Sequence, residues 1–140
     1  MPSFVSKNAS VAYFDSSAFV KLLRLEPESG ALERWTEGWP RRASCALLRV
    51  EVVRALRTAG ASSGAIARAR RLLSGFTLVK LDDRLLDAAA DLPASRLRSL
   101  DAIHLEAART FGADLGALLT YDVRMVEAAE ALGLPVLRPA

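Results

Sequence analysis

Two aspartates follow apolar runs, at positions from which they could bind a divalent cation. Asp15 comes directly after Val-Ala-Tyr-Phe, and Asp122 is the second residue after Ala-Leu-Leu-Thr. If the runs are central parallel strands, their carboxyl ends meet at one edge of the sheet, and both carboxylates lie there. The alternative for each aspartate is a cap on the helix that follows, because aspartate is a common N-cap residue.

A third aspartate, Asp101, interrupts the apolar face of a predicted helix. At about 100° per residue, its neighbours on the helix surface are Leu105 and Ala108, whereas Glu106 and Arg109 lie on the other side. An ionised carboxylate on a buried face needs a partner. A metal ion is one good partner, although the first turn of a helix also offers free backbone N–H groups. Of the acidic residues, Asp101 points most directly to a metal ligand.

The fourth acid, Glu51, lies at the edge of an apolar helical arc that includes Leu48. Taken by itself, it is interpreted as a surface glutamate paired with Arg54 or Arg57. The one histidine, His104, lies on an apolar helical face. We expect a core residue that makes one hydrogen bond there, rather than a general base.

Together, the carboxylates of Asp15, Glu51, Asp101 and Asp122 suit Mg²⁺ or Mn²⁺, which are hard cations that prefer oxygen ligands. Mg²⁺ usually keeps several waters, which leaves coordination positions for a phosphate. Such ions activate water and stabilise the leaving oxygen in phosphodiester hydrolysis. Clustered carboxylates without a cation would repel one another. The pattern therefore favours a metal site.

The elements that must position these acids alternate along the chain, because short apolar runs rich in strand formers are separated by helical patterns. This order predicts an α/β domain with a mainly parallel sheet covered by helices on both faces. Ligands bind such sheets outside the carboxyl ends of the strands, where the strand order reverses. The predicted strands are 11–14, 43–46, 76–79, 117–120 and 136–137, and the predicted helices are 17–24, 30–38, 46–59, 62–74, 83–91, 99–111 and 123–132.

Several of the predicted helices have recognisable ends. Ser62 or Ser63 can cap one of them, and Ser99 can cap another that begins at Leu100. Three glycines follow predicted helices, where a left-handed terminating residue is expected. They are Gly60, Gly112 and Gly133.

The chain as a whole has 140 residues and a formal net charge of +3. This length fits one domain, which we place at 11–140, after a short N-terminal tail at 1–10. The single cysteine, Cys45, excludes a disulfide within the chain and is compatible with a reducing, cytoplasmic environment. No apolar run has the length of a membrane span.

The positive charge is compatible with a polyanionic partner. Basic residues gather at Arg41 and Arg42 and again at Arg68, Arg70 and Arg71. If they share a face they would attract a phosphate backbone. A solvated helix face is an equally good interpretation.

Four segments resemble PIN-domain proteins, in particular VapC-type toxins of bacterial toxin–antitoxin pairs. The segment with the most specific spacing is the last, and the glutamate segment is weak by itself. The resemblance covers nearly the whole chain after residue 10. The segments are YFDSSAFVKLL at 13–23, RVEVVRAL at 49–56, LRSLDAIHLEAA at 97–108 and LLTYDVRMVEAAEALGLPVLRP at 118–139.

This resemblance implies a PIN-like fold with a five-stranded sheet flanked by helices, and Mg²⁺- or Mn²⁺-dependent endoribonuclease activity that uses metal-activated water. It implies RNA as substrate, a cognate antitoxin that covers the catalytic groove, and a homodimer. In the family the catalytic and metal-binding acids match Asp15, Glu51, Asp101 and Asp122, and polar positions that often assist the site match Ser16 and Thr120.

Two other classes of function are compatible with acids at strand ends. One is a PIN-like binding module without activity, against which the four intact acids argue. The other is a receiver-type phosphoacceptor domain, which usually needs adjacent acids near the first strand and a lysine after a late strand. Here Asp15 is followed by two serines, and Lys80 precedes Asp82 and Asp83 at an unsuitable place.

Overall fold

The computed structural model describes residues 10–23, 28–93 and 96–140. Except for Ser10, the predicted N-terminal tail lies outside the described residues. So does residue 24, the expected end of the first helix. Within the described part of the chain, no helix combines the length and the apolarity needed to cross a membrane.

A five-stranded, entirely parallel sheet forms the centre of the molecule, in the order β3-β2-β1-β4-β5. The chain builds outward from β1 in one direction and then returns to build in the other. The strand order therefore reverses between β1 and β4, which is the predicted place for a ligand. The strands are β1 (Val11–Phe14), β2 (Arg41–Cys45), β3 (Thr77–Val79), β4 (Leu115–Leu119) and β5 (Val136–Leu137).

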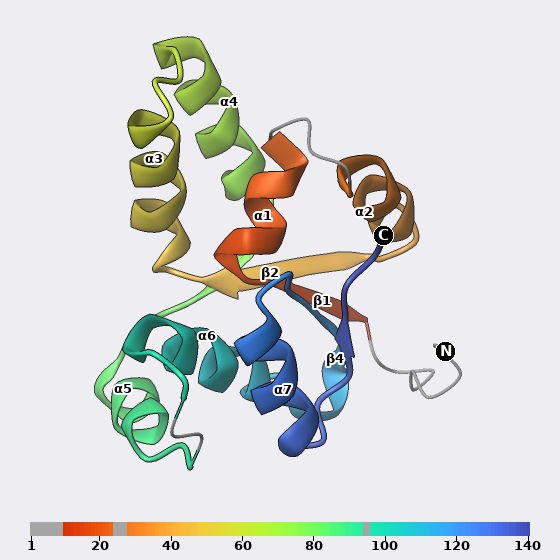
Figure 1. Ribbon diagram of the computed structural model, residues 1–140, viewed down its shortest axis with the longest axis vertical. Coiled ribbons are helices and arrows are strands. Elements are labelled where there is room, and N and C mark those ends of the chain that lie inside the picture. The colour runs from red at the N-terminus through yellow and green to blue at the C-terminus, as the bar shows by residue number, and fades with distance from the viewer. Residues whose placement is uncertain (1–9, 24–27, 94–95) are drawn as a thin grey trace.

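Helices cover both faces of this sheet, α1 to α4 on one face and α5 to α7 on the other (Figure 1). The α/β architecture predicted from the alternating pattern is thereby confirmed. The helices are α1 (Ser16–Leu23), α2 (Ser29–Thr36), α3 (Leu48–Thr58), α4 (Ser63–Ser74), α5 (Asp83–Ala90), α6 (Ser99–Arg109) and α7 (Val123–Ala131), with a 3₁₀ turn at Gly112–Asp114.

Strand β1 is buried on both faces, as expected for a central parallel strand. Ala12 and Phe14 pack under α1 to α4, whereas Val11 and Tyr13 pack against the helices of the other face. The hydrophobic cores on the two faces fix β1 between them. They consequently fix the backbone of Asp15, which follows it.

Most of the expected helix ends are present. Ser62 caps α4 by accepting a hydrogen bond from the backbone N–H of Ala65. Gly60, Gly112 and Gly133 have φ angles of 74°, 53° and 74°, in the left-handed region that glycine adopts without steric cost.

The expected cap at Ser99 is wrong. Arg98 takes the extended N-cap conformation, and Ser99 is the first helical residue. The carbonyl oxygen of Arg98 already accepts from the N–H of Ala102, so the helix begins one residue earlier than the serine suggested. Two strands also begin earlier than predicted, since the register of β1 extends their pairing to Arg41 and Leu115.

Candidate active site

Asp15 lies at the carboxyl end of β1, directly beside the end of β4. The two strands are parallel, with Phe14 opposite Leu119, and the N–H of Asp15 donates to the carbonyl of Leu119 at 3.2 Å. Thr120 follows β4, and its hydroxyl donates a short hydrogen bond to Oδ2 of Asp15. The first predicted acid is thus held at the reversal of strand order, with Thr120 against it.

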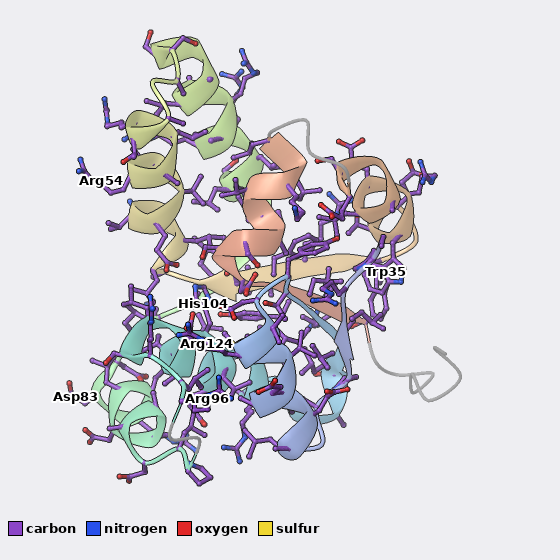
Figure 2. The ribbon with its side chains drawn as sticks, in the orientation of Figure 1. Trp35, Arg54, Asp83, Arg96, His104 and Arg124 are labelled. Atoms are coloured by element: carbon purple, nitrogen blue, oxygen red, sulfur yellow. The ribbon has the colours of Figure 1, made fainter. Side chains whose placement is uncertain are left out.

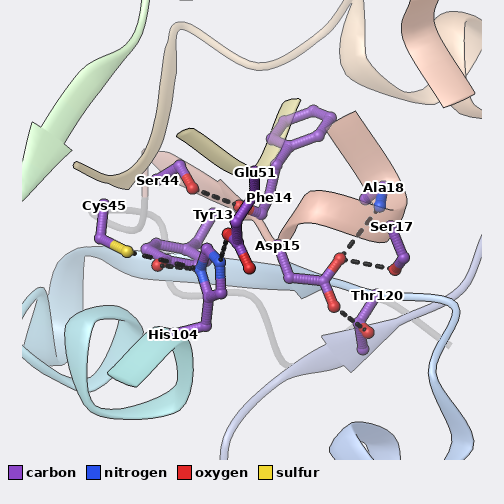
Figure 3. Close-up of polar contacts among 10 residues, drawn as sticks. All are labelled: Tyr13, Phe14, Asp15, Ser17, Ala18, Ser44, Cys45, Glu51, His104 and Thr120. Carbon is purple, nitrogen blue, oxygen red and sulfur yellow. Dashed lines mark hydrogen bonds and ion pairs between the residues drawn. The ribbon is translucent and has the colours of Figure 1, made fainter. Parts of the chain in front are cut away.

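Both carboxylate oxygens of Asp15 accept hydrogen bonds (Figure 3). Besides the bond from Thr120, Oδ1 accepts from the Ser17 hydroxyl at 2.6 Å and from the N–H of Ala18 at 3.0 Å. The side chain is 4% exposed. Burial raises the pKa of Asp15, and the hydrogen bonds from Ser17, Thr120 and Ala18 oppose that rise by stabilising the ionised form. Asp15 therefore caps α1, and it is also a buried acid surrounded by donors.

Asp122 is the N-cap of α7, because its Oδ1 accepts from the N–H of Arg124 at 2.9 Å. Its own N–H donates to the Thr120 hydroxyl at 3.1 Å. The Thr120 side chain thus links Asp15 to Asp122. Asp15 and Asp122 both cap helices, as the alternative interpretation expected. Both also lie at the carboxyl edge of the sheet.

Ser17 forms a second link between the two strand ends. Its hydroxyl donates to Asp15 and accepts from the N–H of Tyr121 at 3.0 Å. Sequence reasoning selected the neighbouring Ser16, which begins α1 and lines a groove next to the acids. The serine that contacts the carboxylate is the second of the pair, and its spacing of two residues from Asp15 was the available signal.

Asp101 enters the same region from the first turn of α6, on the opposite helical layer. It is half-buried. Burial raises its pKa, and the negative charges of Asp122, Asp15 and Glu51 raise it further, while His104 lowers it. Asp101 therefore lies close enough to Asp122, Asp15 and Glu51 for each of them to repel its charge.

Glu51 pairs with His104 and not with Arg54 or Arg57, the partners considered from the sequence. Nε2 of His104 lies 2.7 Å from Oε1 of Glu51. Arg54 instead points outward from α3 (Figure 2). A partner 53 residues away in sequence cannot be inferred from helical spacing, which explains the wrong expectation.

His104 is a core residue, as expected, but it makes more than the single hydrogen bond expected of it. It is 1% exposed, and its Nδ1 lies 2.8 Å from the Tyr13 hydroxyl and 3.6 Å from Sγ of Cys45. Sequence reasoning did not select Tyr13 or Cys45. Both lie in buried strands, where a polar contact leaves no mark on the hydrophobic pattern.

A divalent cation needs several oxygen ligands around one point. In the part of the chain that the structure describes, no three Asp, Glu, His or Cys side chains are arranged as ligands of one ion. The donors are nonetheless carboxylate oxygens, which Mg²⁺ and Mn²⁺ prefer. The repulsion that raises the pKa of Asp101 is also what a bound cation would relieve. In chemistry and charge the residues fit such an ion.

An open groove of about 330 Å³ lies beside Glu51, between α1, α3 and the segment after β4. Glu51 and Ser17 belong to its lining, together with Lys21 and Tyr121. A larger hollow of about 760 Å³ lies beside α3, α4 and β3, and none of the four acids lines it. Of the two hollows, only the smaller one is therefore lined by one of the four acids, Glu51.

Known proteins resemble this chain in sequence and in fold. The PIN domain family matches residues 12–131. Ribonuclease VapC46 of Mycobacterium tuberculosis is 49% identical over 128 residues, covering 91% of this chain and 97% of that protein.

Two solved structures have the same fold. That of Mycobacterium tuberculosis VapC20, described as a Sarcin-Ricin loop cleaving toxin, has a TM-score of 0.71 at 18% identity and covers 91% of this chain and 99% of its own. A toxin–antitoxin complex from Klebsiella pneumoniae has a TM-score of 0.69 at 23% identity, with coverage of 92% and 98%. A match over residues 12–131, together with a relative 49% identical across nearly the whole chain, leaves the receiver-type alternative without support, and the chain belongs to the PIN domain family.

Proposed function

We propose that this chain is a metal-dependent endoribonuclease that acts as the toxin of a toxin–antitoxin pair. The observation that carries the proposal is the position of Asp15 and Asp122 after the ends of β1 and β4, with Asp101 near enough that their charges and that of Glu51 raise its pKa. A relative 49% identical along nearly its full length carries the name ribonuclease, which supports the reaction class.

Asp15, Asp101 and Asp122 would hold Mg²⁺, or alternatively Mn²⁺, and Glu51 would bind the ion or one of its waters. When bound, the cation would activate water for attack on phosphorus and stabilise the leaving oxygen. Thr120 and Ser17 serve this site by keeping the carboxylate of Asp15 oriented. Their hydrogen bonds also favour the ionised form that a cation needs.

The side chains themselves support direct hydrolysis without a covalent enzyme intermediate. Among the described residues, the hydroxyls nearest to Asp15 belong to Ser17 and Thr120, and both are donated to that carboxylate. The one histidine has both ring nitrogens occupied, Nδ1 by Tyr13 and Nε2 by Glu51. Neither hydroxyl is therefore paired with the histidine as the nucleophile and base of covalent catalysis.

RNA would approach through the open groove beside Glu51 and Tyr121. Six exposed arginines of the adjoining α3 and α4 would attract its phosphate backbone. Arg42 belongs to a different surface, because it donates to the carbonyl of Thr36 at the end of α2. The arginines on α3 and α4 are Arg49, Arg54, Arg57, Arg68, Arg70 and Arg71.

A cognate antitoxin and a second copy of the chain complete the proposal. The antitoxin would cover the carboxylates and so block the RNA. The Klebsiella pneumoniae complex supports this partner, because its toxin–antitoxin assembly contains a chain with the same fold. The homodimer rests on the family resemblance of the four sequence segments.

The proposed metal dependence is tested with purified protein and a folded RNA that contains single-stranded loops. We expect cleavage with millimolar Mg²⁺ or Mn²⁺, none with excess EDTA, and recovery when the metal is restored, because carboxylates that repel one another need a cation to bind phosphate. Gel electrophoresis of end-labelled RNA measures the rate. Cleavage that continues undiminished in EDTA would overturn the proposed mechanism.

The proposed toxin role makes a separate prediction in cells. Induced expression should stop bacterial growth, since uncontrolled RNA cleavage blocks translation, and co-expression of the cognate antitoxin should restore it. Growth curves and total-RNA gels measure both effects. Normal growth at high levels of folded, RNA-cleaving protein would contradict the toxin role, although the ribonuclease proposal would stand.

A further inference from the structure

A buried polar chain joins the two helical layers at the carboxyl edge of the sheet (Figure 3). Glu51 comes from α3 on one face, and His104 comes from α6 on the other. Their side chains meet at 2.7 Å. Behind His104, Tyr13 of β1 and Cys45 of β2 contact its other ring nitrogen, at 2.8 and 3.6 Å. The imidazole is therefore held from both sides.

The partners of His104 determine which ring nitrogen donates to Glu51. An ionised carboxylate only accepts hydrogen bonds, so Nε2 must carry the hydrogen. Nδ1 can accept from the Tyr13 hydroxyl in the neutral ring, or donate to its oxygen in the charged ring. Nε2 consequently donates to Glu51 in either state, and the orientation of the pair does not depend on the charge of the ring.

The environment of His104 supports this arrangement. Burial lowers its pKa, but the hydrogen bonds to Cys45 and Glu51 outweigh burial and raise the pKa to about 10. The rings of Tyr13 and His104 also pack in a T-shaped arrangement, with centroids 5.9 Å apart and planes at 76°. A ring packed and bonded in this way has one orientation. It therefore fixes the direction of the hydrogen bond to Glu51, and with it the position of the Glu51 carboxylate.

Glu51 needs such a partner because its neighbours at the site are acids. Its charge contributes to the raised pKa of Asp101, so Glu51 and Asp101 repel each other. Glutamate also has a long, flexible side chain that loses rotamer freedom when it is ordered. Without the donor from α6, the carboxylate would turn toward solvent, where Arg54 and Arg57 lie on the same helix.

We propose that His104 is a positioning residue that holds the Glu51 carboxylate at the acidic site through the bond from Nε2 to Oε1, which would leave the second carboxylate oxygen to bind the metal or its water. His104 itself does not touch substrate, since it is 1% exposed and both its nitrogens are occupied. This role rests on the proposed metal-dependent function. It goes further by assigning a task to a buried histidine outside the four acids.

Three neutral substitutions separate positioning from packing. In His104→Gln the side-chain amide reaches the place of Nε2 and can donate to Glu51. In His104→Asn the amide reaches only the place of Nδ1, near Tyr13. His104→Leu removes both. Because all three variants lose the ring charge equally, differences among them report on the donor and not on the overall electrostatics.

The closing experiment measures Mn²⁺ binding to RNA-free protein by calorimetry, together with kcat and KM for RNA cleavage. Circular dichroism and urea unfolding select the folded variants. We expect the Mn²⁺ affinity of His104→Gln to exceed that of His104→Asn and His104→Leu about tenfold, the usual cost of losing a residue that orients a metal ligand. The loss in cleavage should appear in kcat and not in KM, since RNA is not contacted.

A double-mutant cycle with Glu51→Gln shows whether His104 acts through Glu51. If it does, adding His104→Asn to Glu51→Gln should cost no further Mn²⁺ affinity. Equal Mn²⁺ affinity of the Gln and Asn variants, or fully additive losses in the cycle, would overturn the positioning role while wild-type cleavage left the proposed function intact. A wild-type protein that bound no Mn²⁺ would overturn both.

Discussion

Replacing Asp101 by asparagine should lower the rate of RNA cleavage at least about 100-fold at saturating Mg²⁺, a loss typical of removing a principal electrostatic group from an active site. The substitution keeps the shape of the side chain and removes its charge. Asp101 is half-buried on α6 beside the charges of Asp122 and Asp15. Asparagine relieves that repulsion, so the variant should fold and fail only in binding the cation.

The measurement is the initial rate on end-labelled RNA across a range of Mg²⁺ concentrations. Asp87→Asn is the matched control, because Asp87 is an exposed aspartate on the outer surface of the neighbouring helix α5, and it should cleave at the wild-type rate. If folded Asp101→Asn protein cleaved as fast as this control, Asp101 would not be a ligand of the catalytic metal.

Replacing Asp15 by asparagine should lower the rate of cleavage to a similar extent and, at the same time, make the metal-free protein more stable. Asp15 is buried, and burial raises its pKa. The ionised carboxylate therefore costs free energy in the folded state that it does not cost in the unfolded chain. Asparagine removes the charge, and its oxygen can still accept from Ser17 and Ala18. Its amide must donate to Thr120 in place of the hydrogen bond that Thr120 now donates, which offsets part of the gain. We expect a gain of roughly 0.5–2 kcal/mol at neutral pH, the range typical of a single stabilising substitution.

The sign of this effect fixes its pH dependence. Since the pKa of Asp15 is higher in the folded than in the unfolded state, its contribution to stability is fully present below the unfolded pKa. It is lost as the pH rises through the folded pKa. The advantage of Asp15→Asn should therefore be largest at neutral pH and shrink as the solution is acidified. Urea unfolding in EDTA at several pH values measures it, again with Asp87→Asn as control. A variant less stable than wild type at neutral pH would contradict the buried-charge argument.

The predictions for Asp101→Asn and Asp15→Asn imply that the acids at the carboxyl end of the sheet favour function at a cost in stability. The acids that serve the proposed metal site lower the stability of the metal-free fold, because their charges are partly buried and repel one another. The hydroxyls of Thr120 and Ser17 reduce the free-energy cost of burying the ionised Asp15 carboxylate by donating hydrogen bonds to it. The protein consequently carries this strain at the carboxyl edge of β1 and β4, and a cation that binds there would also stabilise the fold.

Much of this architecture was predictable from the sequence because it depends on local signals. The apolar runs before Asp15 and Asp122 identify strands, and each aspartate then falls at a strand end for geometric reasons. Asp101 is visible because a charge breaks an apolar helical face. Alternation of strands and helices similarly predicts a parallel sheet, since a connection that returns through a helix makes the next strand parallel.

What the sequence by itself determined is therefore the fold class and the end of the sheet where the acids gather. Only the tertiary structure decided how Glu51 and His104 are used, and which serine reaches Asp15. The bond between Glu51 and His104 joins residues 53 positions apart on opposite faces of the sheet. Such a contact depends on how two layers pack across β1 and β2, and helical periodicity carries no information about it. The four carboxylates can be identified from local features of the chain, whereas the contact of His104 with Glu51 forms only once the two helical layers have packed.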